Sequence, residues 1–233
     1  MRIGIIAALP GELKPLVRGK PKMPVARGSG IEMWQWLQDG HEIVAVCAGM
    51  GAAAARRAFT AAEFAGSLDG VLSVGWAGAL TEAAKPAECY VISEIVDAQT
   101  GERFLNGTGE RLVTTAHVAN ATEKMRLASS YGASLVDMEA ATVARLAQMR
   151  GIPMWCFKAV SDGVGAELPD LNPFIDVDGK LKMLPFLAHV AVRPQFWGAL
   201  IALGRNSSAA AIKLAQVTRA FLDTARFEVR REI

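Results

Sequence analysis

Short, almost unbroken apolar runs alternate with stretches of helical pattern along this chain, and that alternation limits its fold more than any other feature. Ile3–Ala8, Gly70–Gly75 and Met154–Val160 are runs of strand length, and the alanine-rich stretch 49–66 between the first two is helix-like. Strands that are apolar throughout are buried on both faces, as in a parallel sheet covered by helices. We therefore predict an α/β fold with three α/β/α layers and a mixed, mainly parallel central sheet.

Glycine and proline residues mark where several of these elements turn or end. Asp39-Gly40 lies between two apolar stretches and is a strong hairpin signal, so the flanking strands should be antiparallel. Gly151 and Pro153 follow a helix-like stretch that begins at Glu139, and they are typical of a helix C-terminus.

The C-terminal part, 185–225, is mostly helical in pattern, and "GRNSS" at 204–208 predicts a break followed by a new helix N-terminus. The most membrane-like stretch is 184–204, but Arg193-Pro194 interrupts it and leaves no clean run of about 18 apolar residues. We expect packed helices there, with a peripheral membrane contact as the minor alternative.

Charge and cysteine content indicate which partners to expect. The 25 lysine and arginine residues against 23 acidic ones leave a formal net charge of +2, and no basic face predicts nucleic-acid binding. A small molecule and another copy of the chain are the expected partners. Cys47, Cys89 and Cys156 lie in or beside apolar runs without metal-ligand spacing, which favours buried, reduced thiols of an intracellular protein. "MRIGIIAALPGE" lacks the pattern of a signal peptide, so a cytoplasmic location is expected.

Carboxylates and glycine turns follow several of the expected strands. The carboxyl ends of parallel strands share one sheet edge, where α/β proteins bind ligands, so Glu12, Glu139 and Asp162 should converge there. Converging carboxylates suit acid/base chemistry or the binding of sugar hydroxyls. Each also has a structural explanation, as a first-turn helix residue favoured by the helix dipole or as part of an ordinary turn. The same edge should carry Gly49, Gly51, Trp76, Ala77, Gly78 and Ser161.

Lys158 interrupts the apolar strand "MWCFKAV". A lysine is seldom buried without a partner, so we expect it to extend from the strand end to a carboxylate.

"GMGAAA" at 49–54 fits the dinucleotide fingerprint G-x-G-x-x-A. Its strand comes from a hairpin, and the acidic residue expected about twenty positions further on is missing. We therefore disfavour nicotinamide or flavin binding.

Five segments taken in order resemble the signatures of the nucleoside phosphorylase/nucleosidase superfamily, and the closest branch is the methylthioadenosine/S-adenosylhomocysteine nucleosidases. These segments, between residue 2 and about residue 163, are "IGIIAALPGEL", "CAGMGAAAA", "SVGWAGAL", "VDMEAATVARLAQMRGIP" and "KAVSDG". The resemblance implies one phosphorylase/hydrolase-like domain over 1–233, of which 164–233 diverges. It also implies cleavage of the N-glycosidic bond of an adenosine-type purine nucleoside, without a metal or redox cofactor, by a homo-oligomer.

The resemblance also implies roles for individual residues. Glu139 would hydrogen-bond the ribose hydroxyls and Met138 would pack against the sugar. Asp162, oriented by Ser161, would protonate the leaving purine at N7, and Glu12 would activate a water. These roles suit an oxocarbenium-like transition state, because positive charge grows on the sugar and negative charge on the base.

Asp162 would have to carry a proton when substrate is bound. An apolar surround favours the protonated carboxyl, and Trp155, Phe157 and Val160 are the candidates for building it.

The chain departs from the family pattern at several positions. Trp76 stands where the family has a small polar residue, so it would crowd the sugar site or stack on a ligand. Lys158 stands where arginine is common, which keeps the charge and loses bidentate geometry. His117 falls in the segment expected to stack on the base, and it is equally explained as a loop histidine. The divergent 164–233 should cover the site or shape its 5′ side, which favours a substrate other than methylthioadenosine, such as one with a large apolar 5′ group.

Three functions stay open at this point. The leading one is hydrolysis, because the Glu12 carboxylate would activate water and repel phosphate. The second is phosphorolysis by the same site, with phosphate as co-substrate held by Gly49 and Gly51 at a helix N-terminus and by Arg56 or Arg57. The third is a nucleoside-binding homologue that has lost catalysis because Trp76 alters its site.

Overall fold

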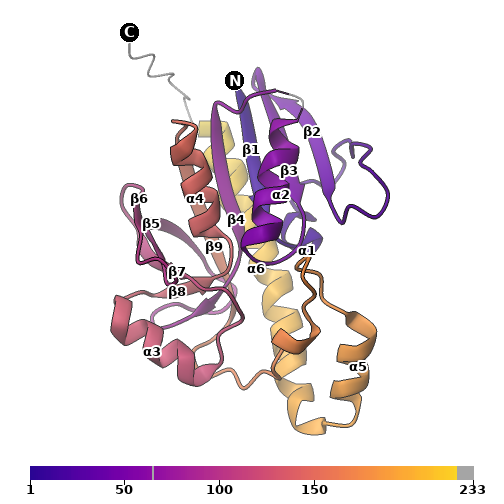
Figure 1. Ribbon diagram of the computed structural model, residues 1–233, viewed down its shortest axis with the longest axis vertical. Helices are drawn as coiled ribbons and strands as arrows, with labels where there is room; N and C mark the ends of the chain where they lie inside the picture. The colour runs from indigo at the N-terminus through magenta and orange to yellow at the C-terminus, as the bar shows by residue number, and fades with distance from the viewer. Residues whose placement is uncertain (65, 225–233) are drawn as a thin grey trace.

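A nine-stranded mixed sheet forms the centre of the protein, in a computed structural model that describes residues 1–64 and 66–224 (Figure 1). The strand order is β2-β3-β1-β4-β8-β7-β5-β6, and β9 pairs with β4 and β5. Within this sheet, β1 pairs in parallel with β3 and β4, and β4 pairs in parallel with β9. The strands are β1 Arg2–Ala7, β2 Glu32–Gln38, β3 His41–Cys47, β4 Gly70–Ala79, β5 Cys89–Asp97, β6 Arg103–Leu105, β7 Glu110–Thr114, β8 Leu135–Asp137 and β9 Met154–Asp162.

Helices cover both faces of this sheet. α2 and α4 pack on one face, and α1 and the long α6 pack on the other (Figure 1). The three-layer α/β/α prediction is therefore confirmed. The α-helices are α1 Pro10–Leu13, α2 Ala52–Glu63, α3 Ala121–Tyr131, α4 Ala140–Met149, α5 Met183–Ala191 and α6 Trp197–Thr224.

The core is divided between the two faces by strand alternation. Ile3 and Ile5 of β1 join a buried cluster that includes Leu214 of α6. Ile6 points to the opposite face and joins a cluster that includes Phe59 of α2. Successive strand side chains point to opposite faces, so an apolar run buries every residue, each contributing about 1.5–3 kcal/mol.

The predicted hairpin is confirmed. β2 and β3 pair antiparallel from Glu32 opposite Cys47 to Gln38 opposite His41. The turn residues Asp39 and Gly40 have φ values of 49° and 78°. Two consecutive positive φ values are the mark of a type I′ turn, whose twist matches that of the flanking strands.

β4 and β9 extend further than the apolar runs that predicted them. Trp76, Ala77 and Gly78 were expected after the strand and belong to β4, while Ser161 and Asp162 belong to β9. The two strands stay paired in parallel beyond Gly75, with an irregularity between Ala77 and Gly78. Strand pairing thus continues past the point where the apolar pattern stops.

The predicted break at "GRNSS" is wrong, because α6 runs without interruption through 204–208. Ser207 is buried there, and Ser208 donates its hydroxyl to the carbonyl of Gly204 at 2.8 Å. Tertiary burial outweighs the small intrinsic helix penalties of glycine, asparagine and serine. The helical pattern breaks instead before Pro194, because a residue that precedes proline avoids the α conformation.

No single helix in the described part of the chain is both long enough and apolar enough to cross a membrane. α5 and the segment Pro194–Thr224 meet that length and composition test only as a pair, and the two are bent by 108°.

Candidate active site

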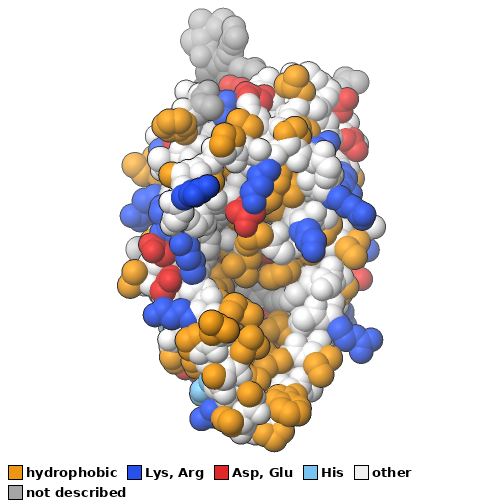
Figure 2. Space-filling model, turned by 90° about the vertical axis from the view of Figure 1, so that its right-hand side faces the viewer, with side chains coloured by type: hydrophobic (Ala, Val, Ile, Leu, Met, Phe, Trp, Pro, Cys, Tyr) orange, Lys and Arg blue, Asp and Glu red, His pale blue; other side chains and the backbone are white. Residues whose placement is uncertain are grey.

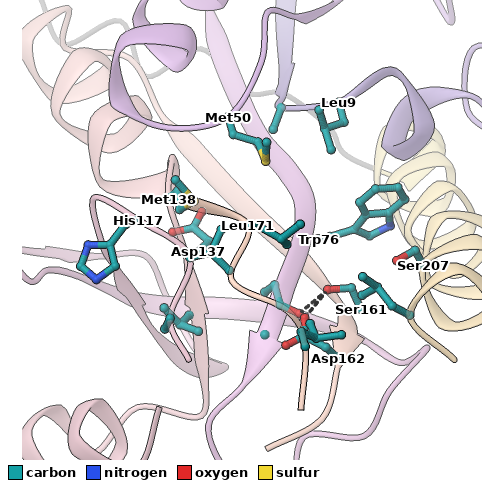
Figure 3. A pocket seen from close by; sticks show the side chains of 18 of the residues that line it. Leu9, Met50, Trp76, His117, Asp137, Met138, Ser161, Asp162, Leu171 and Ser207 are labelled. Atoms are coloured by element: carbon teal, nitrogen blue, oxygen red, sulfur yellow. Dashed lines mark hydrogen bonds between the residues drawn. The ribbon is translucent and has the colours of Figure 1, made fainter. Parts of the chain in front are cut away.

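One cavity of about 270 Å³ lies at the carboxyl ends of β1, β4, β8 and β9 (Figure 3). All three predicted carboxylates, those of Glu12, Glu139 and Asp162, contribute to its lining. The predicted residues Trp76, Ala77, Gly78, Met138 and Ser161 line it as well. The parallel arrangement of β1, β4 and β9 brings Glu12, the end of β4 and Asp162 together, as the strand-end argument predicted. Met138 and Glu139 follow β8, which pairs antiparallel with the end of β4, so the rule of parallel strands does not explain their place in the cavity.

The Glu12 carboxylate is held by backbone N–H groups. Its Oε2 accepts from Ala8 and Leu9, both at 2.8 Å, and its Oε1 accepts from Trp76 at 2.8 Å. Burial raises the pKa of Glu12, and these N–H donors and the Lys158 charge offset part of the rise. Glu12 therefore stays fixed in direction and becomes more basic than an exposed glutamate, which suits a base that removes a proton from water.

Glu139 turns away from its own helix. Its Oε1 accepts from the Gly51 N–H at 2.6 Å, and its Oε2 accepts from the Met138 N–H at 3.3 Å. Burial, followed by the charge of Asp137, raises the pKa of Glu139 to about 7. Glu139 is the N-cap residue of α4, but its side chain makes no capping hydrogen bond, and Asp137 accepts from the Ala140 N–H at 2.9 Å instead.

Lys158 is buried beneath the cavity and does not line it. Its Nζ lies 2.8 Å from Asp137 Oδ2, and the two side chains are 1% and 0% exposed. Burial works against the charged ammonium, but the Asp137 carboxylate raises the pKa of Lys158 above its ordinary value. Lys158 thus meets a carboxylate inside the protein, not at the strand end as expected, and its charge lowers the pKa of both Glu12 and Glu139.

Asp162 has a cationic neighbour that the sequence analysis missed. Ser161 Oγ donates to Asp162 Oδ1 at 2.6 Å, and Lys124 Nζ of α3 donates to Oδ2. Lys124 also donates to the Gly163 carbonyl at 2.9 Å, and its side chain is 4% exposed. A Cβ at Gly78 would lie 3.1 Å from Lys124 Cε, so glycine makes room for this pair.

The three residues expected to build an apolar surround for Asp162, namely Trp155, Phe157 and Val160, do not line the cavity. Trp155 and Phe157 instead pack on Phe221 of α6, with ring centroids 5.1 and 5.3 Å apart. Val160 belongs to the core cluster under β5 and α4. Side chains along a strand alternate between faces, so residues near Asp162 in sequence are directed into the core.

Two signals point to the missed residues in hindsight. Lys124 shares a face of α3 with the fully buried Leu127, three residues further on. Asp137 ends a buried strand directly before a helix, where a carboxylate can accept from free N–H groups.

The glycine turn Gly49–Gly51 is closed by hydrogen bonds and does not open into the cavity, although Met50 lines it. Gly49 has φ +108°, and a Cβ there would lie 2.8 Å from the Asp178 carbonyl oxygen. The N–H groups of Gly49, Met50 and Gly51 donate to Ala8 O at 2.9 Å, Gly179 O at 2.8 Å and Glu139 Oε1 at 2.6 Å.

The two arginines proposed for a phosphate site do not reach the cavity lining. Arg57 donates to the carbonyls of Ala48 at 2.8 Å and Asp178 at 2.6 Å, and Arg56 is exposed on α2. The backbone donors and the nearby guanidinium that phosphate would need are therefore already engaged or turned outward.

Trp76 forms the wall of the cavity next to α6. Figure 3 shows its ring between β4 and Ser207 of α6. A Cβ at Gly11 would lie 2.9 Å from the ring, so glycine lets α1 approach it. The Trp76 Nε1 is buried and has no hydrogen-bond partner among the described residues, which leaves a donor beside the cavity.

His117 lies in the lining on the opposite side (Figure 3). Its side chain is half-exposed, and its Nε2 lies 2.9 Å from Glu123 Oε2.

Residues after 163 contribute apolar side chains to the cavity lining. Asn172 ties this part to the 115–120 loop, because it accepts from the Val118 N–H at 2.9 Å and donates to the Val118 carbonyl at 3.1 Å. The prediction that residues after 163 cover the site is confirmed. The lining residues from this part are Leu168, Leu171, Leu181, Phe186, Leu200, Leu203 and Ser207.

Within the described residues, no group of three or more histidine, cysteine or acidic side chains is placed to hold a metal ion. Cys47 and Cys156 are buried free thiols, and Cys89 is partly buried and also free. Burial raises the pKa of each thiol to about 12, so none is a reactive nucleophile.

This fold and its cavity define a class: an α/β/α protein with a cavity of small-molecule size at the carboxyl ends of its strands, lined by three carboxylates. The model of the phosphorylase superfamily matches residues 2–117 and 100–183, and the chain therefore belongs to this superfamily. The resemblance drawn from the sequence is confirmed at that level, and the match continues beyond residue 163. No curated protein matches the chain.

Solved structures of nucleosidases share the fold. The 5′-methylthioadenosine/S-adenosylhomocysteine nucleosidase of Helicobacter pylori is 17% identical with a TM-score of 0.71, over 97% of this chain and 99% of that chain. Futalosine hydrolase of Helicobacter pylori is 17% identical with a TM-score of 0.72, over 97% and 98%. The 5′-methylthioadenosine/S-adenosylhomocysteine nucleosidase of S. pneumoniae is 20% identical with a TM-score of 0.69, over 96% of this chain and 99% of that chain.

Proposed function

We propose that the protein hydrolyses the N-glycosidic bond of an adenosine-type purine nucleoside and releases the free base, without a metal or redox cofactor. The observation that carries this proposal is the buried Glu12 carboxylate, which three backbone N–H groups hold at a cavity shared with Glu139 and Asp162. The solved structures with this fold include a 5′-methylthioadenosine/S-adenosylhomocysteine nucleosidase and a futalosine hydrolase, which agrees with the proposal.

The two glutamates, Glu139 and Glu12, act on the sugar. As the bond from C1′ to the base breaks, its electron pair leaves with the base and positive charge grows on the ribose. Glu139 binds the ribose hydroxyls and stabilises that charge, while Met138 packs against the sugar. Water then attacks C1′ and gives its proton to Glu12, whose pKa is raised by burial.

Asp162 acts on the purine base and must deliver a proton to N7 as the base leaves. Lys124 Nζ and Ser161 Oγ both donate to this carboxylate. We infer that the ammonium of Lys124 passes a proton to Asp162 as Asp162 gives one to N7, so that the pair ends as a neutral amine and a carboxylate. Lys124 then regains its proton from solvent before the next turnover.

Hydrolysis is favoured over phosphorolysis by the glycine turn. The N–H groups of Gly49–Gly51 already donate to other residues, including Glu139, and Arg57 is held by two carbonyls. A phosphate dianion would also meet the buried Glu12 carboxylate, which repels it. Water needs neither a cationic cradle nor free N–H donors.

The lining of the cavity also indicates which kind of 5′ group the substrate carries. Its C-terminal wall consists of leucines and Phe186, with Ser207 the polar side chain of α6 in the lining. Such a wall binds apolar groups by burial and offers little to a charged amino-acid tail. We propose a substrate with an apolar 5′ substituent that is larger than methylthio. A homo-oligomer remains our expectation for the assembly.

The test is release of free base from methylthioadenosine, S-adenosylhomocysteine, adenosine and inosine, each with and without phosphate. Phosphate-independent release that yields free ribose sugar supports the proposal, and release only with phosphate makes the protein a phosphorylase. Asp162→Asn should nearly abolish turnover, Glu12→Gln should abolish hydrolysis, and the exposed Glu88→Gln is the matched control. Nucleoside binding without any release would identify a homologue that has lost catalysis.

A further inference from the structure

The end of the molecule formed by α5, the short 3₁₀ helix η2 (Pro194–Phe196) and the start of α6 carries large apolar side chains that the fold leaves uncovered. Figure 2 shows hydrophobic side chains gathered over this end, next to a hollow. Soluble monomers seldom expose contiguous apolar patches unless these bind something. The side chains, each at least 51% exposed, are Met183, Leu184, Leu187, Val192, Trp197 and Ile201, and we call them the α5–α6 surface.

The two helices separate their apolar residues by face. Phe186 of α5 and Leu200 of α6 turn inward and line the cavity. Leu184 and Ile201, from the same helices, are 82% and 63% exposed. Helical periodicity requires one apolar face for packing, so a second, outward apolar face has no role in the core.

The lysine and arginine residues around the α5–α6 surface have no acidic residues among them in the sequence. Between Gly179 and Leu222 there is no acidic residue, whereas the whole chain has 23. Lys182 and Arg205 are exposed beside the α5–α6 surface, and Arg193 lies at the bend between its two helices. The cations of this segment are Lys180, Lys182, Arg193, Arg205, Lys213 and Arg219.

We propose that the α5–α6 surface docks on an anionic lipid bilayer. Exposed apolar side chains bordered by lysine and arginine, without acidic residues, are the composition of elements that lie in the membrane interface. Each cation adds attraction to anionic headgroups. The bend of 108° between α5 and the segment Pro194–Thr224 presents both helices as one surface that lies on the bilayer and does not cross it.

A second copy of the chain fits this surface less well. A two-fold contact would place the same patch on both sides, and Lys182 and Arg205 would then face cations of the partner. Anionic lipid supplies the missing negative charge. The proposal does not depend on the proposed reaction, but docking would set the Phe186 and Leu200 wall of the cavity next to the lipid.

Sedimentation of the full chain with vesicles tests the proposal without substrate. One vesicle set is phosphatidylcholine alone, and the other also contains phosphatidylglycerol. We expect binding to the anionic vesicles at low salt, at least about tenfold weaker binding to the neutral ones, and weakening by added salt. The variant Leu184→Ser, Leu187→Ser, Ile201→Ser should lose about tenfold or more of the anionic binding.

Two further variants separate charge from apolar contact. Lys182→Gln with Arg205→Gln should weaken binding to anionic vesicles alone. Leu105→Ser with Phe64→Ser removes apolar side chains that are 84% and 91% exposed on other elements, and it should bind like the wild type.

Three results would overturn the proposal: a wild-type chain that stays in solution with both vesicle sets, equal binding by the triple-serine variant, or a dimer that the triple-serine variant loses without any vesicle binding. The third result would assign the α5–α6 surface to contacts between copies of the chain.

Discussion

The N–H of Gly51 donates a 2.6 Å hydrogen bond to Oε1 of Glu139 and thereby joins the start of α2 to the start of α4 beside the cavity. This bond positions the carboxylate that we assign to the ribose. It also occupies an N–H that a phosphate would otherwise use. In the proposed reaction, this one contact therefore orients the carboxylate toward the sugar and favours water over phosphate as the nucleophile.

The raised pKa of Glu139, about 7, predicts where activity falls on the acid side. A carboxyl with a raised pKa takes up a proton at a higher pH than usual, and the protonated form no longer stabilises positive charge on the ribose. We expect kcat/KM to fall as pH drops through about 7, by about tenfold per pH unit below it. A pH–rate profile checks this, and Glu139→Gln should lose both the rate and this limb. An acid limb at about pH 4, where an ordinary carboxylate titrates, would contradict the assignment.

Removal of the Lys124 ammonium should slow the chemical step. Lys124→Met leaves Asp162 without the cation that donates to it, so we expect kcat to fall by about 10²-fold or more at neutral pH, with a smaller change in KM. Steady-state kinetics provide the measurement. Arg126→Met on the exposed face of α3 is the control and should keep wild-type rates. A Lys124→Met rate within twofold of wild type, about 0.4 kcal/mol, would remove Lys124 from the mechanism.

The buried pair of Lys158 and Asp137 should dominate the stability of the sheet edge at the cavity. Lys158→Met leaves the Asp137 carboxylate buried without its cation, which we expect to cost about 3–5 kcal/mol in the free energy of unfolding. Urea unfolding measures the loss. Lys213→Met removes a lysine that is half-exposed and 3.7 Å from Glu88, and it should change stability by less than about 0.5 kcal/mol. Equal midpoints for the two variants would contradict the role given to the pair.

Trp76→Ser should widen the range of nucleosides that the cavity accepts. The change removes an indole from the cavity wall and leaves room beside the sugar, so kcat/KM for poor substrates should rise about tenfold relative to the best one. We also expect about 3–5 kcal/mol of lost stability. Trp155→Ser, which removes an indole from the far end of β9, is the control for that loss. An unchanged ranking of substrates would show that Trp76 packs in the cavity wall without limiting which nucleosides bind.

Much of the fold could be predicted because local patterns and tertiary structure agree. The buried strand β1, the hairpin turn at Asp39-Gly40 and the helix end at Gly151 each depend on a few neighbouring residues. The convergence of Glu12 and Asp162 was also predictable, because the parallel strands β1, β4 and β9 place their carboxyl ends at one edge. Glu139 joins them after β8, which is antiparallel to β4.

Other features depend on partners that are distant in sequence. "GRNSS" has the composition of a helix break, but α6 continues through it because Ser207 and Ala210 are buried in the tertiary structure. In the sequence, Lys124 resembles any lysine on a helix. It lies 38 positions from Asp162, and only the fold brings the two side chains into contact.

By itself, the sequence determined the alternation of strands and helices, the hairpin, and the placement of Glu12 and Asp162 at one sheet edge, since each follows from residues close in the chain or from the rule of parallel strands. The tertiary structure added Glu139, because β8 pairs antiparallel with β4. Tertiary structure decided the surroundings of those carboxylates and, through burial, the raised pKa of Glu12 and Glu139. Lys158 met Asp137 in the core, Lys124 met Asp162, and the glycine turn gave its N–H groups to Glu139 and other residues. Charged groups interact when they lie within a few ångströms of each other in space, and the spacing of residues in the sequence does not reveal which of them will be that close.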